Sequence, residues 1–353
     1  MKRLMTQQRV LLFAILLPLL TGSGCASCGQ GTLGALSGPI NDPQNRTLRR
    51  QILAYGIGEF CTEMLKHDAP LKLAEDQPII GRFYPHSCQA KEVANGDLFV
   101  SFTGNGYAWT NVSKKLAFDM NGGVEYNQDF LMDGSTMYAY FRTRQVQSSD
   151  FRTRVIEQPM ASLLNQLTPM GDNFGRQLVG SKLAEGFTVI RDKDGNAEFG
   201  LGITDLGMHP PKPFDVHGSS RVAYENTRVE VHQNQRDFVG PIVVEDSGRA
   251  LFVTGNLDGT PAIDVLFMRK DEAEASLGYY LTYAQIGPLA GTPIVGDVMQ
   301  AGVPYTRTVP VPKGTYYVLF DNSATAGQVA PVVNPLDDRA AVVNYVVQVG
   351  DAP

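Results

Sequence analysis

The sequence contains no hydrophobic run long enough to cross a membrane as a helix. Its longest apolar stretch, Val10–Leu20, has about ten residues, whereas a membrane-spanning helix needs roughly 20. Pro18 interrupts this stretch, and proline breaks the hydrogen-bond pattern of a helix. The basic residues Lys2 and Arg3 precede it, and small residues follow it. A basic start, a short apolar centre and a small-residue end are typical of an export signal.

Basic charge is also scarce. The chain has 30 Lys and Arg against 36 Asp and Glu, which gives a formal net charge of −6. A protein that binds nucleic acid needs a basic surface that neutralises phosphates, and anionic lipid likewise attracts basic segments. The composition therefore argues against a nucleic-acid partner and against recruitment to a membrane by charge.

Residues that usually mark an active site are few and scattered. None of the five histidines belongs to a His-Glu-x-x-His motif or a closely spaced His-x-His pair. No serine lies in a Gly-x-Ser-x-Gly turn, and no Walker loop is present. The sequence therefore predicts no catalytic residue and no cofactor.

The chain has four cysteines, and the first of them directly follows the export signal. Residues 21–25 read Thr-Gly-Ser-Gly-Cys, with small side chains where a signal peptidase would cut. This segment resembles the export signal of bacterial lipoproteins. The resemblance implies a signal peptide over residues 1–24 and a diacylglycerol on Cys25, which would anchor the chain in a membrane. Because the next residue, Ala26, is not acidic, it also implies residence in the outer membrane of the cell envelope.

Two alternatives to this interpretation stay open. The segment can be an ordinary secretory signal that is cut near Ala26, and Cys28 can be the lipidated residue. An exported chain folds in an oxidising compartment, where the remaining cysteines tend to pair. We expect a disulfide between Cys61 and Cys88, which leaves Cys28 as an odd thiol.

Composition divides the mature chain into four parts. Residues 25–45 are rich in Gly, Ser and Pro and are predicted to form a flexible tether. Residues 46–205 mix helical and strand patterns, which predicts an α+β domain with helices on an antiparallel sheet. Residues 206–220 form a proline-rich linker. Residues 221–353 contain many short strand patterns, which predicts a β-sandwich or jelly-roll domain.

Local patterns place the elements of these domains. Apolar residues spaced by three and four predict a helix over 46–66, and two further helical stretches cover 160–167 and 174–183. From residue 98 the pattern alternates, and Asn121–Gly123 is predicted to turn the chain between two strands. Eight strands are predicted in the second domain, over residues 227–232, 241–245, 250–256, 262–269, 278–284, 304–309, 315–321 and 341–349. Only residues 271–276 suggest a helical turn there.

The end of the chain carries a second, looser likeness. A proline-glycine turn leads into an aromatic strand within Val309–Asn322, and Tyr345–Val349 forms a last strand. This arrangement resembles the penultimate strand of small secreted β-sandwiches such as bacterial pre-peptidase C-terminal modules. The likeness covers about forty residues and implies a non-catalytic accessory module.

Two sets of residues are candidate ligand sites. Asp192, Asp194, Asn196 and Glu198 supply alternating oxygen ligands of the kind that calcium prefers. The alternative is an Asp-Gly hairpin turn between two strands. Two aromatic pairs, each on one face of a strand, can stack on sugars or line an apolar cavity, or can simply pack in the core. These pairs are Tyr107 with Trp109, and Tyr138 with Tyr140.

Together these patterns favour a lipid-anchored envelope protein that acts as a non-catalytic scaffold or interaction module, with another envelope protein as its partner. One alternative is a binding protein for a lipid or other hydrophobic ligand, because a sheet curved over a helix can enclose an apolar cavity. A second alternative is an envelope hydrolase, for which the sequence indicates no particular pair of carboxylates.

Overall fold

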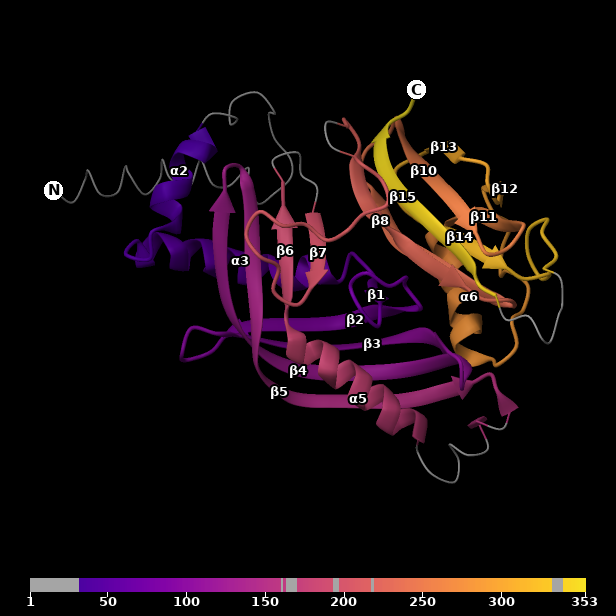
Figure 1. Cartoon of the computed structure of the whole chain (residues 1–353), viewed down its shortest axis with the longest axis horizontal. Helices are drawn as coiled ribbons and strands as arrows, with labels where there is room; N and C mark the ends of the chain where they lie inside the picture. Colours follow the sequence, from indigo (N-terminus) through magenta and orange to yellow (C-terminus); the bar gives the residue numbers. More distant parts are fainter. Residues whose placement is uncertain (1–31, 160, 163–169, 193–196, 217–218, 332–338) are drawn as a thin grey trace.

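The computed structural model describes residues 32–353, except residues 160, 163–169, 193–196, 217–218 and 332–338. Within this part, antiparallel strands form one sheet of seven strands and two sheets of four. Figure 1 shows the seven-stranded sheet beside a sandwich made of the other two. The predicted antiparallel sheet in the first half and the predicted C-terminal sandwich are confirmed, but the first half is richer in strands than an α+β domain implies. No helix in the described ranges is long and apolar enough to cross a membrane.

The first sheet is a meander, in which each strand pairs with the next one along the chain. Its two longest strands have 20 and 21 residues, and the sheet curls into a half-barrel. The strands are β1 (Ala69–Leu71), β2 (Gly81–Glu92), β3 (Leu98–Thr110), β4 (Lys114–Asp133), β5 (Thr136–Ile156), β6 (Phe187–Arg191) and β7 (Ala197–Leu201).

Two helices pack on one face of this sheet. Helix α3 (Arg46–Met64) contributes Ile57, Phe60 and Met64 to the core of the half-barrel, as their spacing of three and four predicts. The Phe60 ring lies 5.5 Å from the Phe141 ring and 6.1 Å from the Phe187 ring. Helix α5 (Met170–Glu185) lies on the same face and contributes two further apolar side chains. The predicted helix over 160–167 lies largely outside the described residues.

A disulfide joins Cys61 of α3 to Cys88 of β2, with a Cα–Cα distance of 5.3 Å. The predicted pairing of these two cysteines is therefore confirmed. Because the bond links a helix to the sheet that it covers, it holds α3 against the half-barrel.

The segment before α3 differs from the flexible tether that its composition predicts. Residues Thr32–Asn41 form helix α2, with Pro39 inside it. Ile40 is buried against Phe130 and Met132 of β4. The Asn41 side chain donates to the Met132 carbonyl and accepts from the Met132 amide, both at 2.8 Å. These contacts attach residues near the start of the described chain to the sheet.

The predicted turn at Asn121–Gly123 is wrong, because β4 runs straight through these residues. The reason is packing: a Cβ on Gly122 would lie 2.5 Å from the Phe102 ring on the neighbouring strand. Glycine at this position lets a large ring cover the strand, so here it marks a close approach and not a turn.

The second half is a sandwich of two four-stranded sheets with an apolar core between them. One sheet has the order β13-β10-β15-β8 and the other has the order β12-β11-β14-β9. The strands are β8 (Val222–Val231), β9 (Gln235–Val244), β10 (Arg249–Asp258), β11 (Ala262–Arg269), β12 (Val295–Gln300), β13 (Tyr305–Val311), β14 (Gly314–Asn322) and β15 (Ala341–Asp351).

One strand prediction in this half is wrong. Residues 278–284 belong mostly to helix α6 (Lys270–Thr282), which extends well beyond the predicted helical turn, and β12 was not predicted. Helix α6 buries Ala273, Leu277 and Tyr280 on one side, at helical spacing. Tyr279 and Tyr280, which belong to the predicted strand over 278–284, therefore lie on a helix.

The two halves are joined by side-chain packing and by backbone hydrogen bonds, in addition to the proline-rich segment. The outer face of the β9–β11–β14 sheet, with α6, packs on Tyr84, Tyr107 and Ala117 of the half-barrel. In addition, the Ile79 amide donates to Arg228 of β8 at 2.7 Å, and the Ile79 carbonyl accepts from Glu230 at 2.9 Å. This contact region is called the junction below.

Candidate functional site

The junction encloses a group of charged side chains that come from both halves. Arg82 of β2 and Asp68, just before β1, belong to the first half, whereas Glu225 of β8, Asp237 of β9 and Tyr345 of β15 belong to the sandwich. The Arg82 side chain is fully buried. These five residues are called the junction cluster.

The guanidinium of Arg82 donates hydrogen bonds to all four other residues of the cluster. Its Nε and Nη2 each lie 2.8 Å from a carboxylate oxygen of Asp237. Its Nη1 donates to Asp68 and lies 3.0 Å from Glu225 Oε2. Its Nη2 also donates to the Tyr345 hydroxyl at 2.7 Å, and that hydroxyl donates to Glu225 Oε2 at 2.7 Å. The cluster thus ties residues far apart in the sequence to one guanidinium.

Charge in the junction cluster is unbalanced, because three carboxylates share one guanidinium. Burial raises the pKa of Glu225 to about 7, although the attraction of Arg82 works in the opposite direction. Burial also raises the pKa of the Tyr345 hydroxyl well above its ordinary value. The raised pKa places the protonation of Glu225 near neutral pH.

Aromatic residues line a small cavity beside Asp237 of the cluster. The Tyr107 hydroxyl donates to Asp237 at 2.7 Å and accepts from the Phe238 amide at 2.9 Å. Trp109 stacks on His232 with ring centroids 3.4 Å apart. A cavity of about 10 Å³ lies between these rings, which is room for a single water molecule.

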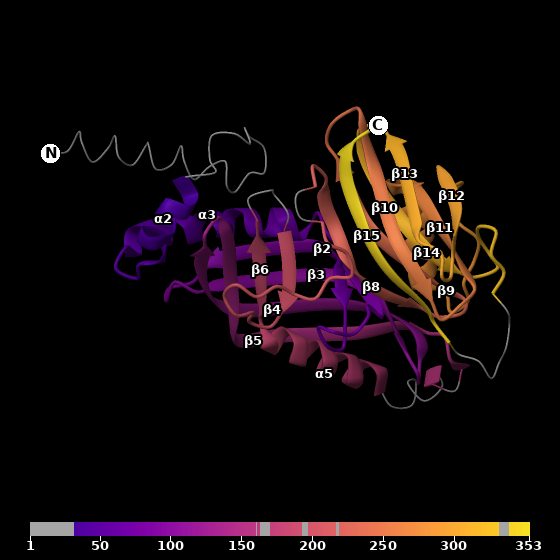
Figure 2. The same cartoon turned by 45° about the horizontal axis from the view of Figure 1, so that its top comes forward.

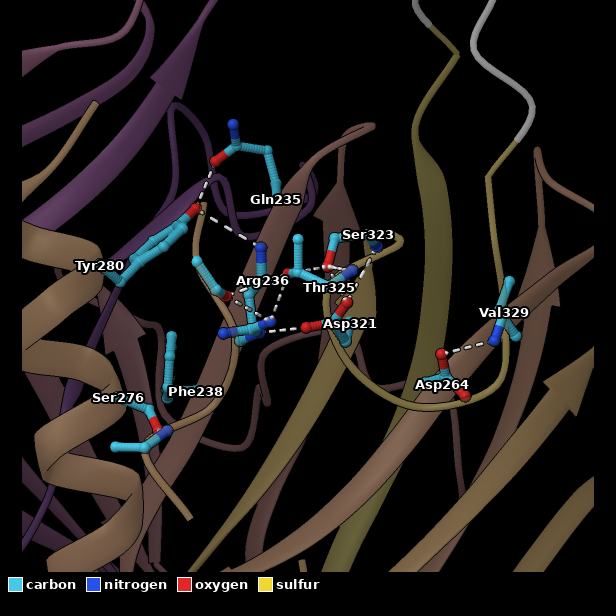
Figure 3. Close-up of polar contacts among 12 residues, drawn as sticks. Gln235, Arg236, Phe238, Asp264, Ser276, Tyr280, Asp321, Ser323, Thr325 and Val329 are labelled. Carbon is cyan, nitrogen blue, oxygen red and sulfur yellow. Dashed lines mark hydrogen bonds and ion pairs between the residues drawn. The ribbon is translucent and has the colours of Figure 1, made fainter. Parts of the chain in front are cut away.

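Figure 3 shows another buried polar group, on the outer face of the sandwich next to α6. Arg236 forms an ion pair with Asp321, which also accepts from the Ser323 amide at 2.9 Å and the Ser323 hydroxyl at 2.6 Å. On the adjacent strand, Asp264 accepts from the amides of Gln328 at 2.8 Å and Val329 at 2.9 Å. These bonds hold the loop after β14 over the sheet.

Both carboxylates in this group are engaged by their own chain. Asp264 and Asp321 are direct cross-strand neighbours, and burial raises the pKa of each. Paired carboxylates can serve as an acid and a base, but that chemistry needs access to a substrate. Here hydrogen bonds from backbone amides and a guanidinium occupy them, so the arrangement favours a structural role.

The structure links Glu198 and Tyr138, two of the candidate ligand residues, through His209, which was not a candidate. His209 Nδ1 lies 2.9 Å from Glu198 Oε2, and its Nε2 lies 3.2 Å from the Tyr138 hydroxyl. Lys212 forms an ion pair with Glu198. Burial alone would raise the pKa of Glu198, but hydrogen bonds from Lys212 and His209 outweigh it and lower the pKa.

Of the other calcium candidates, the structure describes only Asp192. Asp192 accepts from the Thr136 hydroxyl at 2.9 Å, and Asp194 and Asn196 lie outside the described residues. Among the residues that the structure describes, no three His, Cys, Asp or Glu side chains lie close enough to hold a metal ion. Calcium binding by the 192–198 segment therefore stays a prediction, as does lipidation of Cys25, which also lies outside the described residues.

The candidate aromatic pairs make ring contacts within the protein. Tyr107 contacts the Tyr280 ring at 5.1 Å in the junction, and Tyr138 stacks on Tyr140 at 6.5 Å. Tyr107, Tyr138 and Tyr140 are all buried. With Trp109 stacked on His232, these contacts favour packing over ligand stacking.

Sequence reasoning missed the junction cluster. Its only local signal is Arg82, a charged residue between the glycine and the aromatic residues of Gly81–Tyr84. Its partners are 14 to 263 residues away in the chain, and no local pattern links them. Comparison of the sequence with protein-family models and with curated proteins finds no match.

Proposed function

We propose that this chain is a lipid-anchored protein of the bacterial cell envelope, held at Cys25, whose two halves act as one rigid, non-catalytic body that binds another envelope protein. The anchor rests on the resemblance of residues 1–25 to lipoprotein export signals. The location that fits this signal best is the outer membrane.

The junction cluster is the observation that carries the scaffold role. Arg82 is completely enclosed, and its partners come from both sides of the junction. A buried ion pair of this kind is costly to break, because each separated charge would stay in a medium of low polarity. Surfaces on the half-barrel and on the sandwich therefore keep a fixed relation to each other, as a scaffold requires.

An exposed aromatic pair near the junction is the surface that best suits a protein partner. The rings of Tyr279 and Tyr283, on α6 and just after it, lie 4.4 Å apart and are 42% and 52% exposed. Lys115 Nζ of β4 donates to the Tyr283 carbonyl at 2.8 Å, which fixes this end of α6 on the half-barrel. Rigid tyrosines are enriched among residues that dominate binding energy at protein interfaces.

The alternative of a hydrophobic ligand in the first half has less support. Side chains of α3 and α5 pack into the apolar core of the half-barrel, where such a ligand would lie. An envelope hydrolase also has less support, because the buried carboxylates beside α6 are bonded to their own chain. Native mass spectrometry of the purified protein would reveal a retained ligand and would then favour the first alternative.

Two experiments in the producing bacterium test the proposal. A photo-reactive amino acid at Tyr283 should crosslink to one defined protein in intact cells, whereas the same residue at Val303, 53% exposed on the sandwich, should not. Equal or absent crosslinking at both positions would contradict the binding role. Separately, Cys25→Ser should release the chain from the membrane fraction and Cys28→Ser should not. Membrane retention of Cys25→Ser would contradict anchoring at Cys25.

A further inference from the structure

One loop of the half-barrel is hydrogen-bonded to the sheet and exposes several apolar side chains. Residues 202–210, called the flap, cross the face of β5, β6 and β7 that lies opposite α3. The Thr204 amide donates to Thr188 Oγ1 of β6 at 2.9 Å, and the His209 ring is hydrogen-bonded to Tyr138 and Glu198. These bonds hold the flap on the sheet and cover Tyr138.

Three apolar side chains of the flap are exposed. Ile203, Leu206 and Met208 are 39%, 46% and 61% exposed. Single exposed apolar residues are common on proteins, but here they occupy three of six consecutive positions. A cluster of exposed apolar side chains on a loop that is held to the sheet by hydrogen bonds is typical of a surface that contacts another apolar phase.

The flap lies at the end of the half-barrel that the anchor can reach. Gly207 lies beside Asp133, because a Cβ there would be 3.5 Å from the Asp133 carboxylate. The preceding residue, Met132, holds Asn41 of α2 through two hydrogen bonds. In Figures 1 and 2, α2 and this end of β4 and β5 lie on the side of the molecule away from the sandwich.

Chain length limits how far this end can be from the membrane. Residues 26–31 separate Cys25 from Thr32, and even a fully extended chain would span only about 25 Å over this interval. The ten residues of α2 add about 15 Å. An acylated Cys25 therefore keeps the β4–β5 end within about 40 Å of the lipid surface without any unfolding of α2.

We propose that the flap is the membrane-contacting surface of the protein and that Ile203, Leu206 and Met208 enter the interfacial layer of the bilayer. This inference rests on the proposed lipid anchor at Cys25. Because Asp133 and Asp205 lie beside the apolar residues and the chain is acidic, the contact is apolar and not electrostatic, and it persists at high salt.

The test uses the full mature chain, lipidated at Cys25 and reconstituted into phosphatidylcholine vesicles. In a Trp109→Phe background, which removes the single tryptophan, Met208→Trp should lose most of its emission to lipids brominated near the headgroup. Val303→Trp, on the sandwich, should keep its emission. As a second measurement on the unmodified sequence, amides of residues 203–208 should exchange more slowly in vesicles than in detergent.

Each other outcome overturns the inference in a distinguishable way. If the protein floats with the vesicles but Met208→Trp is not quenched and the flap amides are not protected, the anchor holds and the flap inference fails. If the protein does not float with vesicles, the proposed lipid anchor is wrong, and the inference about the flap is then wrong as well. If the flap amides are equally protected in detergent and in vesicles, without quenching, the flap contacts a second copy of the chain and not lipid.

Discussion

Arg82 and Asp237 face each other across the junction, with Nε 2.8 Å from Oδ1 and Nη2 2.8 Å from Oδ2. Two parallel hydrogen bonds between a guanidinium and a carboxylate fix direction as well as distance. Since Arg82 belongs to the half-barrel and Asp237 to the sandwich, this pair helps to fix how the two halves are oriented.

Removal of Arg82 should therefore destabilise the whole molecule. We expect Arg82→Met to lower the free energy of unfolding by about 3–5 kcal/mol, because three carboxylates would stay buried without their cation. Arg50→Met is the matched control: Arg50 pairs with Glu92 but is 76% exposed, so its loss should cost at most about 1 kcal/mol. Urea unfolding measures both variants, and equal losses would contradict the role of the junction cluster.

The raised pKa of Glu225 predicts a pH dependence with a definite sign. The pKa is about 7 in the folded protein against an ordinary value of 4.5, so the folded state binds more protons between these values. The free energy of unfolding should therefore be highest below about pH 4.5 as far as this group is concerned. It should fall as the pH rises to about 7, by an amount on the order of 3 kcal/mol.

Glu225→Gln isolates this effect, because glutamine keeps hydrogen-bonding atoms and carries no charge at any pH. The wild type should lose stability relative to Glu225→Gln as the pH rises through this interval. The measurement is urea unfolding of both proteins at a series of pH values. Parallel stability curves would show that Glu225 does not take up the proton.

The disulfide should contribute substantially to the stability of the half-barrel. Cys61 and Cys88 are 27 residues apart, and closing a loop of this length in the unfolded chain is worth about 3.5 kcal/mol in the chain-entropy model. The double variant Cys61→Ser, Cys88→Ser should lose about this amount in urea unfolding. Reduction of the wild type should give a similar loss, whereas reduction of the double variant should change nothing.

A comparison of Gly327 and Gly302 can separate the cost of a steric clash from the cost of backbone strain. Gly327 and Gly302 have similar φ values, +68° and +73°, so alanine strains the backbone at both positions. A Cβ on Gly327 would lie 2.1 Å from the Asp264 carboxyl carbon, whereas nothing lies within 4 Å of one on Gly302. We expect Gly327→Ala to cost about 1–3 kcal/mol more than Gly302→Ala. Equal thermal stabilities would mean that the loop after β14 moves freely away from Asp264.

Elements with a strong local signal were predictable from the sequence. The helix over 46–66 follows from apolar spacing and appears as Arg46–Met64, and the Cys61–Cys88 pair follows from the small number of cysteines. Errors arose where a residue serves packing at a distance. Gly122 reads as a turn but lies under the Phe102 ring, and Tyr280 reads as strand but lies on a helix against the half-barrel.

The site residues could not be predicted because their contacts are also with distant parts of the chain. Glu198 was singled out for its neighbours in the sequence, but its contacts are with Lys212 and His209. The cluster around Arg82 depends on the docking of two sheets, and docking is a property of their surfaces and not of any local pattern. The sequence shows only that Arg82 is a charged residue within a strand pattern and has no acidic neighbour. Because a buried charge needs a partner, such a residue hints at a partner far away in the chain.

The pairing of Ile79 with β8 bears on whether the sandwich could exist alone. β8 is the outermost strand of its sheet, and Ile79 occupies backbone groups along that rim. A fragment that begins after the proline-rich segment would leave this rim bare, together with the apolar side chains that now meet the half-barrel. We expect such a fragment to self-associate through this rim, so the C-terminal half should be expressed together with the half-barrel.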